Sequence, residues 1–145
     1  MTNHYPTDAA IERIGLGLLG GSLPKPEWTH AAHFAATLWL LRCRPEISPP
    51  ENLPDIIRAY NQATGVPNTD TGGYHETITQ ASIRAAKDFL KRFPATRPLH
   101  EIHGALMASR LSDKAWLLDY WSSERLLSVE ARRVWVDPDL KDLPF

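Results

Sequence analysis

Apolar residues recur at helical spacing through most of the chain, and this pattern predicts a series of helices rather than strands. The first helix is expected to begin at Thr7 or Asp8, either of which can cap it, and to stop at Gly20. Its apolar positions are Ile11, Ile14, Leu18 and Leu19. The segment that follows, 23–26, contains two prolines that fix the backbone φ angle, so we predict a stiff connector there.

The segment from Glu27 to about Cys43 carries apolar side chains on almost every side of the predicted second helix. These side chains are Ala31, Ala32, Phe34, Ala35, Ala36, Leu38, Trp39, Leu40 and Leu41. A helix that is apolar all round is buried among other helices, because it has no polar face to turn towards water. We therefore predict that this helix lies at the centre of a bundle.

Segments rich in proline and glycine divide the rest of the chain into further elements. The predicted elements are a third helix from about Leu53 to Ala63, a fourth that begins at Tyr74 or His75 and ends before Pro94, a fifth that begins after Pro98, and a short sixth from about Asp113 to Trp121. Residues 134–140 have no helical period and are expected to be extended. The predicted fold is all-α: a compact bundle of about five helices, formed by residues 1–145 as one domain, with an extended C-terminal tail packed on it.

Composition narrows the possible classes of protein. The chain is 43% hydrophobic and 23% charged, with a formal net charge of −1, and it has no basic tract that would neutralise nucleic-acid phosphates. The single cysteine, Cys43, excludes an internal disulfide and a cysteine-rich zinc module, and we expect its thiol to be buried. No apolar run reaches the length of a membrane span, so we expect a cytoplasmic protein with no membrane or nucleic-acid partner.

Three histidines stand where the predicted helices would bring them together. His30 and His33 are three residues apart on the most buried helix, so they share one face, and Thr37 extends the same stripe. His75 follows at the predicted start of the fourth helix, with Glu76 beside it. Helical bundles build metal sites from inward side chains at this spacing, and three imidazoles plus a water are the ligands of an open catalytic zinc site.

The other interpretation is that these are core histidines whose hydrogen bonds are satisfied by the backbone and by neighbouring side chains. The same spacing recurs at His100 and His103, where we expect partial exposure, so the spacing alone is weak support for a metal. The setting of His30 and His33 is more informative. Two imidazoles on a buried apolar helix would cost a few kcal/mol unless they had partners.

Gly15-x-Gly17-x-x-Gly20 matches the dinucleotide-binding fingerprint in letters only. That motif works between a strand and a helix, where its glycines let the backbone approach a pyrophosphate. Here a helical pattern precedes the motif, a Pro-x-Pro connector follows it, and no strand–helix–strand unit is predicted. We therefore do not expect a nucleotide site at these glycines.

Three segments together resemble a group of small uncharacterised bacterial proteins. The segments are Trp28-x-His30-x-x-His33, Gly72-Gly73-Tyr74-His75-x-Thr77 and Val136-x-Pro138-Asp139-Leu140, which correspond to W-x-H-x-x-H, G-G-Y-H-x-T and V-x-P-D-L. The resemblance covers most of the chain after residue 23. It implies a shared architecture and a shared set of special residues, and it implies no reaction.

The leading hypothesis is a small metalloprotein, with zinc, iron or nickel held by His30, His33 and His75 inside the bundle. If the site is catalytic, a metal-activated water would be the nucleophile and Glu76 the nearest candidate base. The predicted pocket residues are Trp28, Thr37, Tyr74 and Tyr120.

The alternative belongs to a different class: a non-catalytic module that binds a small molecule or another protein. In that case the histidines and Glu76 form a buried polar network that fixes the bundle or recognises an anionic small molecule. Substitution by alanine separates the two hypotheses. Loss of bound metal with intact helicity supports the first, and loss of stability with no metal to lose supports the second.

Overall fold

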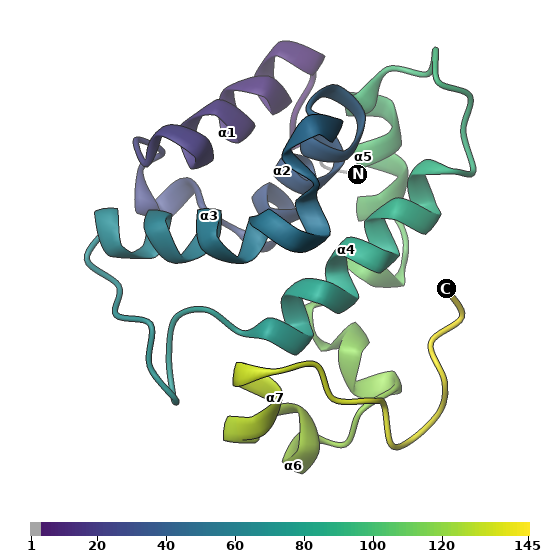
Figure 1. Cartoon of the computed structure of the whole chain (residues 1–145). Coiled ribbons are helices and arrows are strands. Elements are labelled where there is room, and N and C mark those ends of the chain that lie inside the picture. The colour runs from purple at the N-terminus through teal and green to yellow at the C-terminus, as the bar shows by residue number, and fades with distance from the viewer. Residues whose placement is uncertain (1–3) are drawn as a thin grey trace.

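The computed structural model describes residues 4–145, and every regular element in that range is a helix (Figure 1). The longer helices are α1 (Asp8–Gly20), α2 (His30–Cys43), α3 (Pro49–Ala63), α4 (Glu76–Leu90) and α5 (Leu99–Met107). The shorter elements are α6 (Ser123–Leu126), α7 (Val129–Arg133) and the 3-10 turns η1 (Lys25–Glu27), η2 (Pro45–Ile47), η3 (Arg110–Ser112) and η4 (Lys114–Asp119). The predicted all-α bundle of about five helices is confirmed.

Helix α2 lies at the centre of the bundle, as its all-round apolar pattern predicts. It packs against α1, α3, α4 and α5, and most of its side chains from Ala31 to Leu40 are buried. Figure 1 shows α1 and α3 side by side on one flank, with α4 crossing the molecule diagonally and α6 and α7 below its first turn. The N-terminal turns of α2 and α4 are each partly buried, with exposed or half-buried residues such as His30 and His33 in the first turn of α2.

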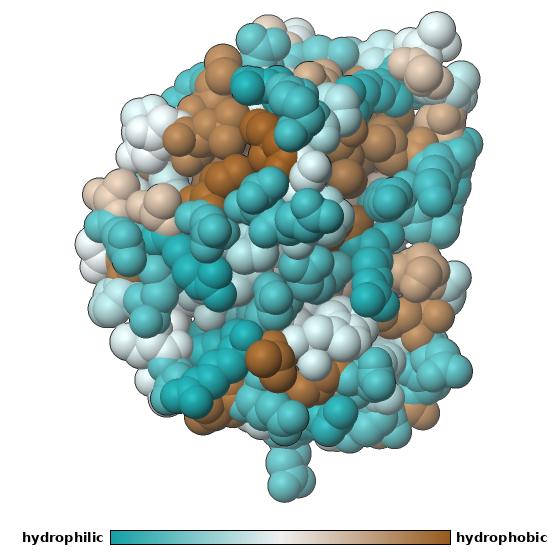
Figure 2. Space-filling view, viewed as in Figure 1, coloured by the Kyte–Doolittle hydropathy of each residue, from teal (hydrophilic) through white to brown (hydrophobic). Residues whose placement is uncertain are grey.

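Apolar side chains on the face drawn in Figure 1 gather over its upper part, where α1 and α2 lie (Figure 2). Most of the lower part of this face is hydrophilic. Across residues 4–145, none of the helices combines the length and the apolar character that crossing a bilayer would need.

The glycines of the first helix serve close packing. A Cβ atom placed on Gly15 would overlap the indole ring of Trp39 on α2, and one on Gly17 would lie 2.9 Å from Cβ of Leu23. Gly15 therefore lets α1 and α2 approach closely, and Gly17 lets the connector that follows α1 pack against the helix. The Gly-x-Gly-x-x-Gly letters thus have a packing explanation in a helix.

Two helices begin at places that differ from the prediction. Helix α2 starts at His30, three residues after the predicted Glu27, because the Thr29 side chain accepts a hydrogen bond from the Ala32 amide at 3.2 Å and caps the helix. Trp28, with φ −82° and ψ 67°, is not helical and separates η1 from α2. His30 is therefore the first residue of its helix.

Helix α3 starts at Pro49, four residues before the predicted Leu53. Proline is tolerated in a first helical turn, since its missing N–H would have no partner there. Pro54 lies inside the helix and leaves the carbonyl of Pro50 without its usual amide donor. Gln80 on α4 replaces that donor, and its Nε2 bonds the Pro50 oxygen at 2.7 Å.

Other local predictions were wrong. The short sixth helix predicted from about Asp113 to Trp121 is present over Lys114–Asp119, but as the 3-10 helix η4, which begins where the Asp113 side chain accepts from the Ala115 amide at 2.8 Å. Cys43 is exposed, because it is the last residue of α2 and lies past the part of that helix that the core covers. His103 is only 1% exposed, and its Nε2 donates to the Ala31 carbonyl at 2.9 Å.

The C-terminal tail packs on the bundle, as predicted. Nε1 of Trp121 donates to the Val136 carbonyl at 3.0 Å, which holds the tail against the segment before α6. The Thr77 hydroxyl on α4 donates to the Val134 carbonyl at 2.9 Å and accepts from the Val136 amide at 3.2 Å. Together these bonds fix the tail to the first turn of α4.

Candidate functional site

A cavity of about 520 Å³ opens where the first turns of α2 and α4 approach η1, η4 and α7. Much of its lining is apolar or aromatic, including Leu18, Trp28, Phe34, Leu53, Ile57, Val66, Ile78, Trp116 and Leu117. Its volume lies in the range of about 300–1,000 Å³ that is typical of sites for small organic molecules. This cavity is the candidate functional site.

Six of the eight predicted site residues line this cavity. They are Trp28, His30, His33, Thr37, Tyr74 and His75. Glu76 and Tyr120 are not part of the lining. The three histidines thus share one cavity, although the roles of their side chains differ.

His75 is held by hydrogen bonds at both of its ring nitrogens. Nδ1 accepts from the Ile78 amide at 3.1 Å, so the side chain caps the N-terminus of α4. Nε2 donates to the Leu126 carbonyl at 2.8 Å and ties α4 to α6. Burial lowers the pKa of His75, so the ring stays neutral with its proton on Nε2.

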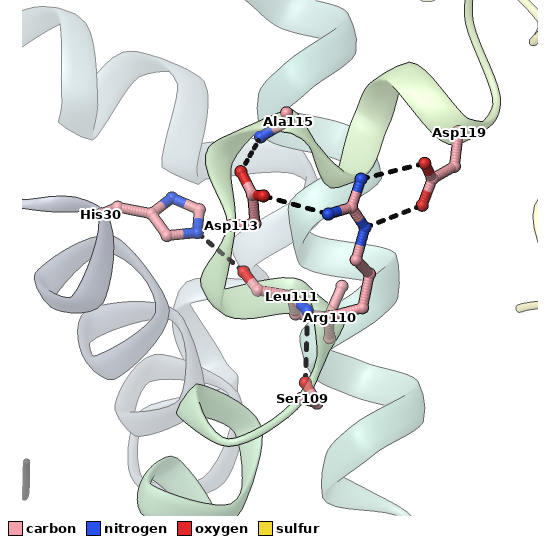
Figure 3. A network of polar contacts seen from close by, with 7 residues as sticks. All are labelled: His30, Ser109, Arg110, Leu111, Asp113, Ala115 and Asp119. Atoms are coloured by element: carbon pink, nitrogen blue, oxygen red, sulfur yellow. Dashed lines mark hydrogen bonds and ion pairs between the residues drawn. The ribbon is translucent and has the colours of Figure 1, made fainter. Parts of the chain in front are cut away.

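His30 connects the start of α2 to the wall of the cavity formed by residues 109–119 (Figure 3). Its Nε2 donates to the Leu111 carbonyl at 2.7 Å. The same wall is held together by Arg110, whose guanidinium donates two hydrogen bonds of 3.0 Å to Asp119 and one of 3.0 Å to Asp113. This network positions η4, which carries Lys114 and Trp116 to the cavity.

His33 is the histidine whose ring nitrogens remain available. Its imidazole stacks on Trp28, with ring centroids 3.9 Å apart and planes inclined by 26°, and within residues 4–145 neither nitrogen bonds another protein group. More than a third of His33 is exposed to solvent, which reaches the ring through the cavity. Desolvation, followed by the charges of His30, Lys25 and Lys114, lowers the pKa of His33 to about 3, so the ring is neutral near pH 7.

The geometry gives the predicted three-histidine metal site no support. Across residues 4–145 no three side chains of His, Cys, Asp or Glu are grouped as metal ligands would be. His75 uses one nitrogen as a helix cap and the other as a donor to a carbonyl, so it has no lone pair left for a metal. The three-histidine site stays a prediction.

Glu76, the predicted base, is engaged with a neighbouring phenol. Oη of Tyr74 donates to its Oε1 at 2.6 Å, and Nε2 of Gln80 lies 3.5 Å from the same oxygen. Burial and this hydrogen bond raise the pKa of Tyr74 far above its usual value, so the phenol keeps its proton. Arg58 covers the Tyr74 ring at 4.3 Å. The arrangement orients Tyr74 as part of the cavity wall.

The charged residues of the lining are all cationic. Lys25, Lys114 and Arg132 line the cavity, and no aspartate or glutamate does. Arg132 donates to the carbonyls of Gly73 and Tyr74, each at 3.1 Å. Within the described residues none of the three cations lies within 4 Å of a carboxylate, although ion pairs form at many other arginines. A protein with a net charge of −1 thus carries a locally positive cavity.

Trp116 is a further member of the lining that the sequence did not single out. It is 1% exposed, and its Nε1–H has no hydrogen-bond acceptor within the described residues. A buried indole N–H normally finds a partner. Lys25 and Lys114 were also missed, because they come from segments about 90 residues apart, and no spacing rule connects such segments. Arg132 belongs to a charged segment of the tail that was expected to form solvated ion pairs, and it lines the cavity instead.

No family model, curated protein or solved structure matches the chain.

Proposed function

We propose that this protein binds a small organic molecule in the cavity between the first turns of α2 and α4. The observation that carries the proposal is the cavity itself: about 520 Å³, walled largely by apolar and aromatic side chains, with a few polar groups directed into it. Sites for small molecules combine an apolar wall with a small number of placed polar groups in this way.

The unused polar groups of the cavity support a ligand rather than a purely structural role. Structural histidines such as His75 and His103 bond the backbone of neighbouring elements. His33 makes no such bond, and Trp116 leaves its Nε1–H without an acceptor. Groups that fold stability does not use are available to a bound molecule.

The experiment is a screen of small organic fragments by ¹H–¹⁵N NMR, read at the indole N–H signals of the five tryptophans. Trp28 and Trp116 line the cavity, whereas Trp39, Trp121 and Trp135 do not. Fragments that bind are expected to shift the first two signals and to leave the other three in place. Each signal is assigned by a Trp→Phe variant.

A filled cavity provides the control. Ser82→Phe places a ring in the lining and is expected to abolish the shifts, whereas Lys87→Phe, at an exposed position of the same helix, is expected to preserve them. Shifts that persist unchanged in the Ser82→Phe protein, or that fall only on Trp39, Trp121 and Trp135, would overturn the proposal.

A further inference from the structure

We propose that the ligand is an organic acid whose oxyanion head group binds at Lys25, Lys114 and His33 and whose apolar body lies along the hydrophobic wall of the cavity. These three residues are called the oxyanion subsite. The inference rests on the proposed function, because it names the chemical class of the molecule that the cavity takes.

The charges around His33 carry the first part of the argument. Lys25, Lys114 and His33 line the same cavity, and the positive charges of the two lysines act on the His33 imidazole. The cavity lining offers no carboxylate to balance them. A cationic ligand or a bare metal ion would be repelled there, and an anion would be attracted.

The nearest carboxylate on η1 is already paired with another residue. Glu27 forms a bidentate ion pair with Arg13 on α1, with N···O distances of 2.7 and 3.2 Å, and this pair holds the pKa of Glu27 below its usual value. Lys25, in the same turn, has its ammonium 5.9 Å from the centre of the Tyr60 ring and is not paired with Glu27. Its charge is therefore available to a ligand.

Lys114 is placed by the network in Figure 3. The His30–Leu111 bond joins the start of α2 to the wall, and Arg110 connects Asp113 and Asp119 on either side of Lys114. Both carboxylates are thereby committed to Arg110, and the pairing lowers the pKa of Asp119. The wall thus presents a lysine to the cavity and keeps its acids elsewhere.

His33 adds a directional donor to the two charges. A neutral imidazole has one N–H to donate, and the stack on Trp28 fixes the plane in which that N–H lies. The first turn of α2, which carries His33, also contributes the positive end of a 14-residue helix. An oxyanion at this point would meet two ammonium groups and one N–H donor.

Arg132 is not part of the subsite, because its Nη1 donates to the carbonyls of Gly73 and Tyr74 and so holds the side chain beside the start of α4. Much of the remaining lining, including Phe34, Leu53 and Ile57, is apolar, although polar residues such as Thr37 and Asn61 also belong to it. A simple inorganic anion would leave this surface in contact with water. An acid with a hydrocarbon or aromatic body would cover it, and this burial is favourable.

The experiment compares four ligands that share one chain and differ in the head group: octanoate, octyl phosphate, 1-octanol and octylammonium. Dissociation constants are measured by calorimetry for the parent protein and for a Lys25→Gln/Lys114→Gln variant. The matched control is Lys87→Gln/Lys91→Gln, which removes two exposed lysines at the far end of α4 that do not line the cavity.

At least one of the two anions is expected to bind at least tenfold more tightly than 1-octanol, with octylammonium the weakest. Each lysine is expected to contribute about fivefold to anion affinity, as partly exposed charges do. The double variant should therefore lose most of the preference for the anion and keep its affinity for 1-octanol, and the control should behave as the parent. Which anion is preferred distinguishes a carboxylate ligand from a phosphate ester.

The inference is overturned if 1-octanol binds as tightly as both anions, or if the double variant keeps the preference. In either case the proposed function stands if the octyl compounds shift the indole signals of Trp28 and Trp116, and it fails if they bind without shifting them. Absence of binding by all four compounds, with cavity-directed shifts from uncharged fragments in the NMR screen, also overturns the organic-acid inference and leaves the proposed function intact.

Discussion

At the scale of single residues, the three predicted histidines perform three different tasks. His75 caps a helix, His30 connects two segments through a carbonyl, and His33 stacks on Trp28 with its nitrogens free of protein partners. Residue type and spacing correctly indicated that all three face one cavity. Spacing could not show which nitrogens were already bonded, because that depends on carbonyls contributed from Leu111 and Leu126, far along the chain.

Substitution of His75 tests its structural role. His75→Ala removes the cap of α4 and leaves the Leu126 carbonyl without a donor, so we expect it to lower the free energy of unfolding by about 2–3 kcal/mol. His75→Asn keeps a capping side chain and should lose only about half of that. Urea denaturation gives both values. An Ala variant as stable as the parent would show that these bonds do not stabilise the fold.

Elemental analysis of the parent protein and the His75→Asn variant tests the metal hypothesis. Because both nitrogens of His75 are engaged in the protein, we expect the metal content to be the same in the parent and in the His75→Asn protein. Protein purified without chelator is measured by mass spectrometry before and after incubation with zinc, iron or nickel. Near-stoichiometric metal that disappears in the variant would establish the three-histidine site instead.

Histidines whose pKa is lowered by the fold, two of them buried, also make stability depend on pH. Desolvation lowers the pKa values of His33, His75 and His103 in the folded protein, whereas the unfolded chain titrates at about 6.5. Below pH 6.5 the unfolded state therefore binds more protons than the folded state, and stability falls as the pH falls. Urea midpoints at pH 7 and pH 5 check the direction, and His103→Gln should reduce the difference. Greater stability at pH 5 than at pH 7 would contradict the lowered pKa values of these histidines.

At the scale of elements, local signals predicted the helices well and the 3-10 segments poorly. Thr7 caps α1 as predicted, because a cap acts through the nearest few residues. The starts of α2 at His30 and of α3 at Pro49 were misplaced by three and four residues, although each also has a local cause, the Thr29 cap and a proline in the first turn. The wall formed by η3 and η4 depends instead on a bond to His30 and on Arg110, which the sequence around it does not reveal. Tertiary contacts decided its conformation.

The Arg110 network is expected to matter more for the shape of this wall than for overall stability. Arg110→Ala removes three exposed hydrogen bonds and should change the unfolding free energy by less than about 1 kcal/mol. Amide hydrogen exchange in residues 110–119 should nevertheless become faster, and octanoate binding weaker. Arg92→Ala, which breaks an ion pair with Asp88 on α4, is the matched control. Equal exchange in the two variants would show that the network does not hold the wall.

At the scale of the whole molecule, separate segments combine to give the cavity its character. Lys25 precedes α2, Lys114 lies in η4 and Arg132 lies in α7, and the fold brings all three to one lining without a carboxylate. The sequence alone predicted the histidine part of this site, since those residues stand at helix starts. The positive part follows only from the packing of the bundle.

Because the charges that line the cavity are all positive, we expect the affinity for an anionic ligand to depend on salt concentration. The two lysines of the oxyanion subsite are exposed at the cavity mouth, so dissolved ions reach and screen them. The affinity for octanoate should fall by about threefold to tenfold between 20 mM and 500 mM sodium chloride, as loss of two partly exposed charge interactions would give. The affinity for 1-octanol should not fall. A decrease of equal size for octanoate and 1-octanol would show that salt acts on the protein as a whole and not on the two lysines.

The central claim, that a small molecule binds inside this cavity, is tested most directly by the indole N–H signals of Trp28 and Trp116 during a titration with octanoate. The account predicts saturable shifts of both signals, with the signals of Trp39 and Trp135 unmoved and the response abolished by Ser82→Phe. Binding measured by calorimetry that leaves the signals of Trp28 and Trp116 in place would put the ligand elsewhere and contradict the account.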